Sequence, residues 1–259
     1  MFGVVPRVLW EKRKPADPQN RIQMGNNLLL LRGEGRMILV DTGIGDKIDQ
    51  KFANIYAVDH SERHLPGSLE KLGLKPEDVT DVILTHLHFD HAGGATLRDS
   101  SGSIRPTFPN AAYYLQKRQW EQGMQPSEKD RASYFPENYL PLQEHGRLVI
   151  VEGEKELFPG VELIPIHGHT PGQQMVLVRG ENQTLLYAGD LLPTSAHLPI
   201  PWVMAYDLYP MTTIEEKKRY LRRAADEEWL IVFEHDPEIR CATVQWNGKD
   251  YGLKTVREM

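Results

Sequence analysis

The sequence predicts an α/β protein, because short apolar runs of strand character alternate with segments that carry helix signals. A second observation narrows this prediction. Several of the strand candidates run directly into histidine or aspartate, and loops at strand ends are where sheet proteins commonly carry functional side chains. We therefore expect a sheet-based domain whose functional site lies on loops at one edge of its strands.

The strand candidates are rich in β-branched and apolar residues and are bounded by glycine or polar residues. They lie at residues 4–10, 27–31, 37–40, 81–84, 111–115, 148–151, 162–166, 175–178, 185–188, 230–233, 240–246 and 251–256. Helices are predicted at residues 48–56, 68–72, 116–122 and 213–227, with a further helix start at 76–78. Thr213 with Glu216 predicts a capping box for the last helix, and Asn247-Gly248 predicts a hairpin turn.

The densest group of candidate ligands follows the strand predicted at residues 81–84. Three of the ten histidines in the chain and one aspartate fall within six residues there, namely His86, His88, Asp90 and His91. His86 and His88 are two residues apart, so on extended backbone both point to the same side and can bind one ion. Such clusters are typical of metal or catalytic sites.

The pattern His86-x-His88-x-Asp90-His91 resembles the signature of the metallo-β-lactamase-fold hydrolases. Three later segments are similar to the remaining motifs of that family: Gly168-His169-Thr170-Pro171-Gly172, Tyr187-Ala188-Gly189-Asp190 and Phe233-Glu234-His235-Asp236. The resemblance covers about residues 26–235. It implies a four-layer αβ/βα sandwich of two mixed β-sheets flanked by helices, formed as one domain over residues 1–259.

The resemblance also implies a site for two divalent metal ions. One ion would be held by His86, His88 and His169, the other by Asp90, His91 and His235, with Asp190 bridging them. Imidazole and carboxylate ligands without thiolate suit zinc, iron or manganese, and zinc is the default expectation. A shared water would have its pKa lowered from 15.7 towards ~7, and Asp90 is expected to pass a proton to the leaving group. In the family, the segment Asp41-Thr42-Gly43 orients a ligand; the same residues are equally typical of an Asx-type turn, and the two roles are compatible.

Within the superfamily, the sequence resembles most the branch of lactonases and methyl-parathion-hydrolase-like enzymes. We therefore expect a hydrolase that cleaves an ester-like bond, either a lactone such as an acyl-homoserine lactone or an organophosphate ester. One alternative is a thioesterase similar to hydroxyacylglutathione hydrolase, although its C-terminal helical extension is not visible here. Alternatives of another class are a mononuclear iron persulfide dioxygenase and a non-catalytic metal-binding protein.

Several other residues are candidates for substrate contact or for local support of the site. The apolar and aromatic segment 191–207 would wall a pocket, where Tyr206 and His197 either contact substrate or pack the loop. His60 and His64 lie in a predicted loop and either face substrate or are solvated. His167 competes with His169 as a ligand, but the motif favours His169. Gln173 stands where the family often has histidine or serine, which leaves its hydrogen bonding open.

Whole-chain properties restrict the partners. The formal net charge is −6 and the chain has no lysine- or arginine-rich run, which argues against binding of nucleic acid. No apolar run approaches the ~18 residues of a membrane span, and the first residues lack a secretory pattern. The single cysteine, Cys241, cannot form an internal disulfide and fits a reducing cytoplasm. We expect a cytoplasmic enzyme for a small-molecule substrate, with a homodimer suggested by its aromatic-rich loops.

Overall fold

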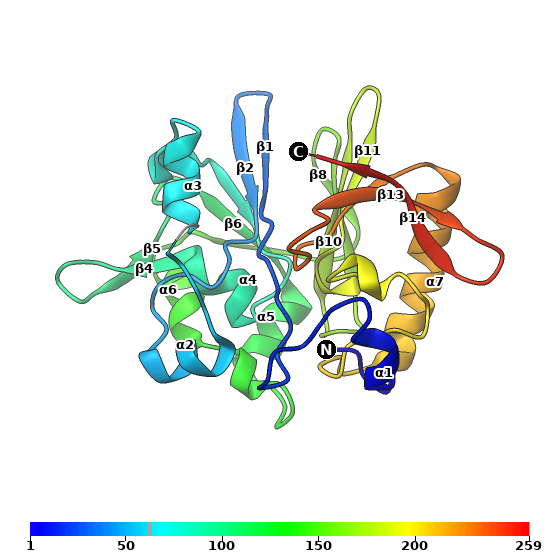
Figure 1. The fold of residues 1–259 in the computed structure, drawn as a ribbon. Coiled ribbons are helices and arrows are strands. Elements are labelled where there is room, and N and C mark those ends of the chain that lie inside the picture. Colours follow the sequence, from blue (N-terminus) through cyan, green and yellow to red (C-terminus); the bar gives the residue numbers. More distant parts are fainter. Residues whose placement is uncertain (62–63, 259) are drawn as a thin grey trace. The chain divides into compact units, whose positions relative to one another are not determined.

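The computed structural model describes residues 1–61 and 64–258, so that part of the loop containing His60 and His64 lies outside the described residues. The chain divides into two compact units. We call Leu28–Glu152 the middle unit, and the combination of Met1–Asn27 with Gly153–Met259 the terminal unit. Each unit contains its own mixed β-sheet and its own helices (Figure 1), which confirms the predicted α/β class.

The middle unit is built on a five-stranded sheet with the order β1-β2-β3-β6-β7. Its strands are β1 (Leu29–Gly33), β2 (Arg36–Val40), β3 (Asp81–Ile83), β6 (Ala112–Gln116) and β7 (Leu148–Val151). A separate ribbon pairs β4 (Thr96–Arg98) with β5 (Ile104–Pro106). The helices are α2 (Gln50–Tyr56), α3 (Leu65–Lys71), α4 (Phe89–Ala92), α5 (Lys117–Met124) and α6 (Leu140–Glu144), with 3₁₀ turns η1 (Pro76–Asp78), η2 (Gly93–Ala95), η3 (Arg131–Ser133) and η4 (Pro136–Asn138).

The register of this sheet decides where its loops emerge. β2, β3, β6 and β7 are parallel neighbours, and only the β1–β2 hairpin is antiparallel. β2 and β3 are buried almost throughout, and strands buried on both faces form nearly continuous apolar runs, which is why these two are readable in the sequence. Val40 pairs with Ile83 at the ends of β2 and β3. The segments that begin at Asp41 and Leu84 therefore leave the same edge of the sheet.

The terminal unit is built on a seven-stranded sheet with the order β14-β13-β12-β11-β10-β9-β8. Its strands are β8 (Lys155–Phe158), β9 (Val161–Ile166), β10 (Gln173–Arg179), β11 (Thr184–Tyr187), β12 (Leu230–Val232), β13 (Cys241–Trp246) and β14 (Tyr251–Arg257). The other elements are α1 (Arg7–Trp10), α7 (Pro210–Asp226) and the 3₁₀ turns η5 (Gly189–Leu191) and η6 (Ser195–His197).

Three loops meet at one edge of this second sheet. β11 and β12 are parallel and end side by side, with Tyr187 paired to Val232. β10 runs antiparallel to β11, so the β9–β10 connection at residues 167–172 lies at the same edge. Helix α7 packs on the sheet through Tyr220, Leu221 and Ala224, which belong to its apolar core. The sheet thus delivers the loops that carry His169, Asp190 and His235 to one place.

Most predicted elements agree with the structure to within a few residues, but two predictions are wrong. Residues 4–10 do not form a strand: helix α1 begins after Pro6, and the side chains of Val4 and Val8 are 94% and 70% exposed. The expected capping box is also absent. Helix α7 already begins at Pro210, and the carboxylate of Glu216 accepts hydrogen bonds from another loop instead.

Other differences concern short elements. The helix start predicted at residues 76–78 is a single 3₁₀ turn, and the ribbon β4–β5, strand β8 and helices α4 and α6 were not predicted. Cys241 is buried in β13, and its thiol donates to the carbonyl of Arg257. None of the helices in the described part of the chain combines the length and apolarity that a bilayer crossing requires.

Candidate metal centre

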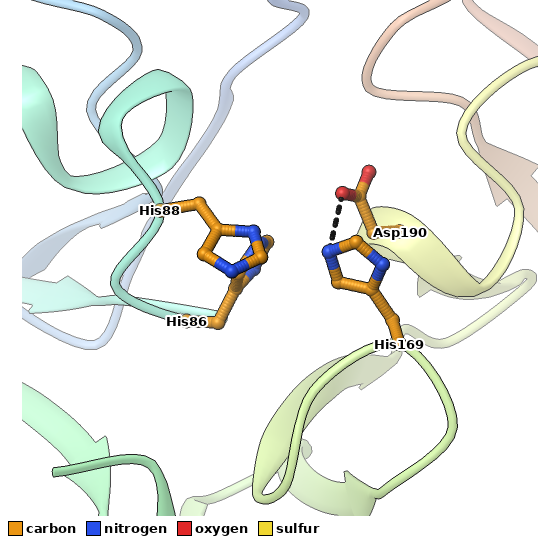
Figure 2. A group of neighbouring side chains, drawn as sticks. All are labelled: His86, His88, His169 and Asp190. Atoms are coloured by element: carbon orange, nitrogen blue, oxygen red, sulfur yellow. Dashed lines mark ion pairs between the residues drawn. The ribbon is translucent and has the colours of Figure 1, made fainter. Parts of the chain in front are cut away.

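In the middle unit, four predicted ligands lie together after β3. The ring centroid of His86 lies 4.5 Å from that of His88 and 3.9 Å from that of His91. Asp90 Oδ1 lies 3.8 Å from His91 Nε2. His88 is still extended and directly precedes α4, so the chain turns into a helix between His88 and Asp90. Figure 2 shows the imidazoles of His86 and His88 beside each other.

The carboxylate of Asp41 orients this group from the end of β2. Asp41 Oδ2 lies 3.0 Å from His91 Nδ1, as the resemblance implies. The backbone N–H and the hydroxyl of Thr85 donate to Asp41 at 2.7 and 2.6 Å. Because the Thr85 hydroxyl proton is given to Asp41, its contact of 3.0 Å with His86 requires the proton to sit on His86 Nδ1. Nε2 of His86 and of His91 then remains as the ligand atom.

The backbone around these ligands is tightly packed. Asp41 has a φ of +56°, a left-handed conformation that is uncommon for a residue other than glycine. A Cβ at Gly93 would lie 1.9 Å from the carbonyl oxygen of Ile44, so only glycine fits there. The ammonium of Lys47 donates to the carbonyls of Gly93 and Thr96, and burial lowers the pKa of Lys47 to about 8.

In the terminal unit, Asp190 lies between two of the predicted histidine ligands. Asp190 Oδ2 is 3.0 Å from His169 Nε2, the ion pair drawn in Figure 2, and Asp190 Oδ1 is 3.1 Å from His235 Nε2. All three side chains are buried. Each carboxylate oxygen of Asp190 thus lies within ion-pair distance of a different imidazole.

Both histidines of this group are oriented through Nδ1. His235 Nδ1 donates to the carbonyl oxygen of Gly25 at 2.9 Å, and His169 Nδ1 lies 2.9 Å from Asp207 Oδ1. Burial alone would lower the pKa of His169, but Asp190 and then Asp207 outweigh burial and raise it to about 9. The role of Asp207 is not predictable from the sequence, because no local pattern links it to a histidine 38 residues earlier.

The remaining candidates have structural contacts. His167 Nδ1 accepts the backbone N–H of Gly172 at 3.0 Å, so this ring braces the loop that carries His169. Gln173 is fully buried, and within residues 1–61 and 64–258 its side-chain amide has no hydrogen-bond partner. The hydrogen bonding of Gln173, which the sequence left open, is therefore unsatisfied within the described residues.

The candidates for substrate contact differ in exposure. Tyr206 is 54% exposed, whereas His197 is 1% exposed and stacks on Phe2 with a centroid distance of 4.6 Å. Burial, followed by Lys217, lowers the pKa of His197 to about 3, so this ring is neutral and packs the loop. His64 Nδ1 accepts the N–H of Gly67 and caps α3, while His60 is partly exposed. These contacts favour a packing role for His197 and a helix-capping role for His64.

The two groups of residues fit divalent metal ions by their chemistry. Four of the five histidines have Nδ1 engaged by a carboxylate, a hydroxyl or a backbone carbonyl, which leaves Nε2 for coordination. The donors are imidazole nitrogen and carboxylate oxygen, the ligands that zinc, iron and manganese share. The residues of each unit therefore suit a divalent metal ion both in the type of ligand atom and in its orientation.

The sequence model of the metallo-beta-lactamase superfamily matches residues 22–235. The chain belongs to this superfamily, and the fold predicted from its motifs is the fold of that family.

Its relatives are lactonases and other metal-dependent hydrolases. An N-acyl homoserine lactonase of Bacillus cereus is 31% identical over 178 residues, which is 65% of this chain and 64% of that protein. A probable metal-dependent hydrolase of Staphylococcus aureus has a structure with a TM-score of 0.88 and 30% identity, over 100% of this chain and 92% of that one. An N-acyl homoserine lactone hydrolase, solved with the product N-hexanoyl-L-homoserine at its catalytic metal centre, has a TM-score of 0.66 and 27% identity, with 88% of each chain covered. The chain thus stands in a class of metal-dependent hydrolases.

Proposed function

We propose that this protein is a dinuclear metal-dependent hydrolase that opens the lactone ring of N-acyl homoserine lactones or of related esters. The observation that carries the proposal is the carboxylate of Asp190, whose two oxygens lie 3.0 and 3.1 Å from Nε2 of His169 and His235. This division of the two oxygens between two imidazoles supports a carboxylate shared by two ions. The lactonases among the relatives support the choice of substrate.

In the proposed centre, the ligands act as the sequence motifs imply: His86, His88 and His169 hold one ion, Asp90, His91 and His235 hold the other, and Asp190 bridges them. When bound, two zinc ions supply a water of lowered pKa and Lewis-acid polarisation of the carbonyl. Asp41 and Asp207 keep their histidines in the tautomer that offers Nε2. The Asp90 side chain, 25% exposed beside His91, carries the proton to the leaving alkoxide oxygen.

An aromatic wall next to Asp90 supports an acylated substrate. Phe52 and Tyr56 of α2 pack with Phe89 and Phe135, with ring centroids 4.5 to 5.8 Å apart. Burial, and then the charge of Asp90, raises the pKa of the Tyr56 phenol, which indicates that Asp90 lies near this wall. An acyl chain would bury its methylenes there, at about 0.8 kcal/mol for each. The same wall fits the aromatic leaving group of an organophosphate ester, which is our second candidate substrate.

Metal analysis followed by a substrate panel tests this proposal. We expect about two ions per chain, and hydrolysis of hexanoyl-homoserine lactone that a chelator abolishes and zinc restores. The panel includes a phosphotriester, a glutathione thioester and a β-lactam. His88→Ala should lose turnover, whereas His145→Ala, at an exposed position on the same unit, should retain it. One iron per chain without hydrolysis of any ester would overturn the proposal in favour of a persulfide dioxygenase.

The expected cellular setting is part of the same proposal. We propose a cytoplasmic protein that acts on a small molecule, and a homodimer remains our expectation for its assembly. Size-exclusion chromatography with light scattering tests the assembly, and fractionation of the source cells tests the location.

A further inference from the structure

Two adjacent side chains near the start of α7 hold two different loops of the terminal unit. Glu216 accepts the backbone N–H of His167 at 2.7 Å and that of Gly168 at 3.1 Å. Lys217 donates to three carbonyl oxygens, those of Pro199, Ile200 and Trp202, at 2.7, 3.1 and 2.9 Å. Glu216 therefore binds the loop that leads into His169, and Lys217 binds the loop that follows Asp190.

The environment of Lys217 shows that its role is to hold backbone. The side chain is fully buried, and its three N–H bonds meet three neutral carbonyls. Burying an ammonium is costly, and burial lowers the pKa of Lys217 to about 7, although Asp250 and Asp207 oppose this effect. An apolar side chain of the same length would fill the space but take the donor away from the carbonyls of Ile200 and Trp202, whereas that of Pro199 would keep the N–H of Trp202 at 3.0 Å.

Both loops converge on the contact between His169 and Asp207. Asp207 follows the segment held by Lys217, and its Oδ2 accepts the N–H of Met204 at 3.2 Å while Oδ1 faces His169. The N–H of Leu208 donates to the carbonyl of His169 at 3.0 Å. On the other side, a Cβ at Gly168 would lie 2.4 Å from the backbone nitrogen of Thr213, so the loop before His169 sits directly on α7.

We infer that Glu216 and Lys217 are positioning residues that set the register between His169 and Asp207. Glu216 fixes the backbone that carries the imidazole, and Lys217 fixes the backbone that carries its carboxylate partner. Together they determine where Nε2 of His169 points. The catalytic consequence of this inference rests on the proposed metal function. The contact between His169 and Asp207 itself lies wholly within the terminal unit.

The helix provides matched controls one residue away. Glu215 and Lys218 form an exposed ion pair of 2.7 Å, with side chains 67% and 54% exposed. The test compares Glu216→Gln and Lys217→Met with Glu215→Gln and Lys218→Met in the full chain. Far-UV circular dichroism establishes that each variant is folded.

Two readouts separate positioning from general stability. In zinc-loaded protein, transfer of metal to a chromophoric chelator should be ~10-fold faster for one of the two ions in Glu216→Gln and Lys217→Met, as is usual when support of a ligand is lost. The absorption spectrum of the cobalt-substituted protein should change as well. Both controls should match the wild type in release rate and spectrum.

A third readout needs no metal and keeps the inference separate from the proposed function. The Nδ1–H proton of His169 bonded to Asp207 should give a low-field NMR resonance, assigned by its loss in Asp207→Asn. We expect the resonance to shift or disappear in Glu216→Gln and Lys217→Met. If folded variants keep the wild-type resonance, release rate and spectrum, the inference is wrong. If Lys217→Met does not fold while Glu216→Gln behaves as wild type, the pair is merely structural and the inference is also wrong. If the wild-type chain binds no metal, the proposed function is refuted. The NMR result would still decide whether Glu216 and Lys217 position His169 and Asp207.

Discussion

The ligand groups of the two units are oriented by the same devices but assembled in different ways. In each, an aspartate holds Nδ1 of one histidine: Asp41 lies 3.0 Å from His91, and Asp207 lies 2.9 Å from His169. In each, a desolvated lysine holds backbone carbonyls nearby: Lys47 in the middle unit and Lys217 in the terminal unit.

The difference is in how far along the chain the ligands are spread. The middle group comes from six consecutive residues, so the local backbone sets most of its geometry. The terminal group takes its ligands from three separate loops, at His169, Asp190 and His235, and depends on contacts between them. We therefore expect substitutions far from the ligands to disturb the terminal group more than the middle group.

The largest expected effect follows removal of the carboxylate between the two terminal histidines. Asp190→Ala should lower kcat/KM for the lactone on the order of 10³-fold, since several kcal/mol of transition-state stabilisation depends on the metal centre. Metal content measured by atomic emission should fall in parallel. Asp226→Ala, on the exposed end of α7, is the control and should retain both metal and activity. Full metal content in Asp190→Ala would contradict the bridging role.

The next prediction compares the two orienting aspartates directly. Asp41→Asn and Asp207→Asn should each weaken metal binding by ~10- to 100-fold, because each removes the charge that fixes a histidine tautomer. Asp41 also accepts two bonds from Thr85, so its substitution should have the larger effect. Competition with a chelator of known affinity measures both constants. If Asp207→Asn weakened metal binding more than Asp41→Asn, the middle group would depend less on Asp41 than we propose.

A third prediction concerns the glycines that let the ligand loops approach other backbone. Gly93→Ala and Gly168→Ala should each destabilise the protein by about 1–3 kcal/mol, because the new methyl would lie 1.9 Å and 2.4 Å from other atoms. Chemical denaturation measures the free energy of unfolding. Gly33→Ala has no atom within 4 Å of the added methyl and should change that free energy by less than about 0.5 kcal/mol. Equal effects at all three positions would refute the packing explanation.

The last prediction distinguishes the two buried lysines by pH. Burial lowers the pKa of Lys47 to about 8 and that of Lys217 to about 7, whereas an unfolded lysine keeps its proton up to about 10.4. Between these values the unfolded chain binds more protons, so the free energy of unfolding should rise with pH, by at most about 1.4 kcal/mol per pH unit for each lysine. Lys47→Met should lose the rise in the free energy of unfolding that begins near pH 8. Lys217→Met should lose the rise that begins near pH 7. Urea titrations from pH 6.5 to 10 measure the difference, and identical pH profiles for wild type and variants would contradict it.

The same contrast explains what the sequence revealed. The ligands in the middle unit stand in a local motif after an apolar strand, and both features can be read without a structure. The supports of the terminal group cannot be read in this way: Asp207 meets a histidine 38 residues away, and Glu216 meets His167 across 49. Thr213 and Glu216 have the spacing of a capping box, yet Glu216 binds two N–H groups of another loop. Local pattern alone does not decide between competing donors for one carboxylate.

Helix α1 shows a second limit. Residues 4–10 are apolar enough for a strand, but Pro6 fixes its own φ at −59°, and a single helical turn follows with Val8 and Leu9 exposed. An apolar run predicts a strand only where a neighbouring strand can cover it.

The bond from His235 to the carbonyl of Gly25 has a practical consequence for anyone who engineers this protein. A main-chain acceptor cannot be deleted by changing a side chain, so the hydrogen bond at His235 Nδ1 depends on the path of the amino-terminal segment. Lys14 anchors that segment through Asp236, at 2.8 Å. Shortening the amino-terminal segment should therefore disturb the orientation of a histidine more than two hundred residues downstream.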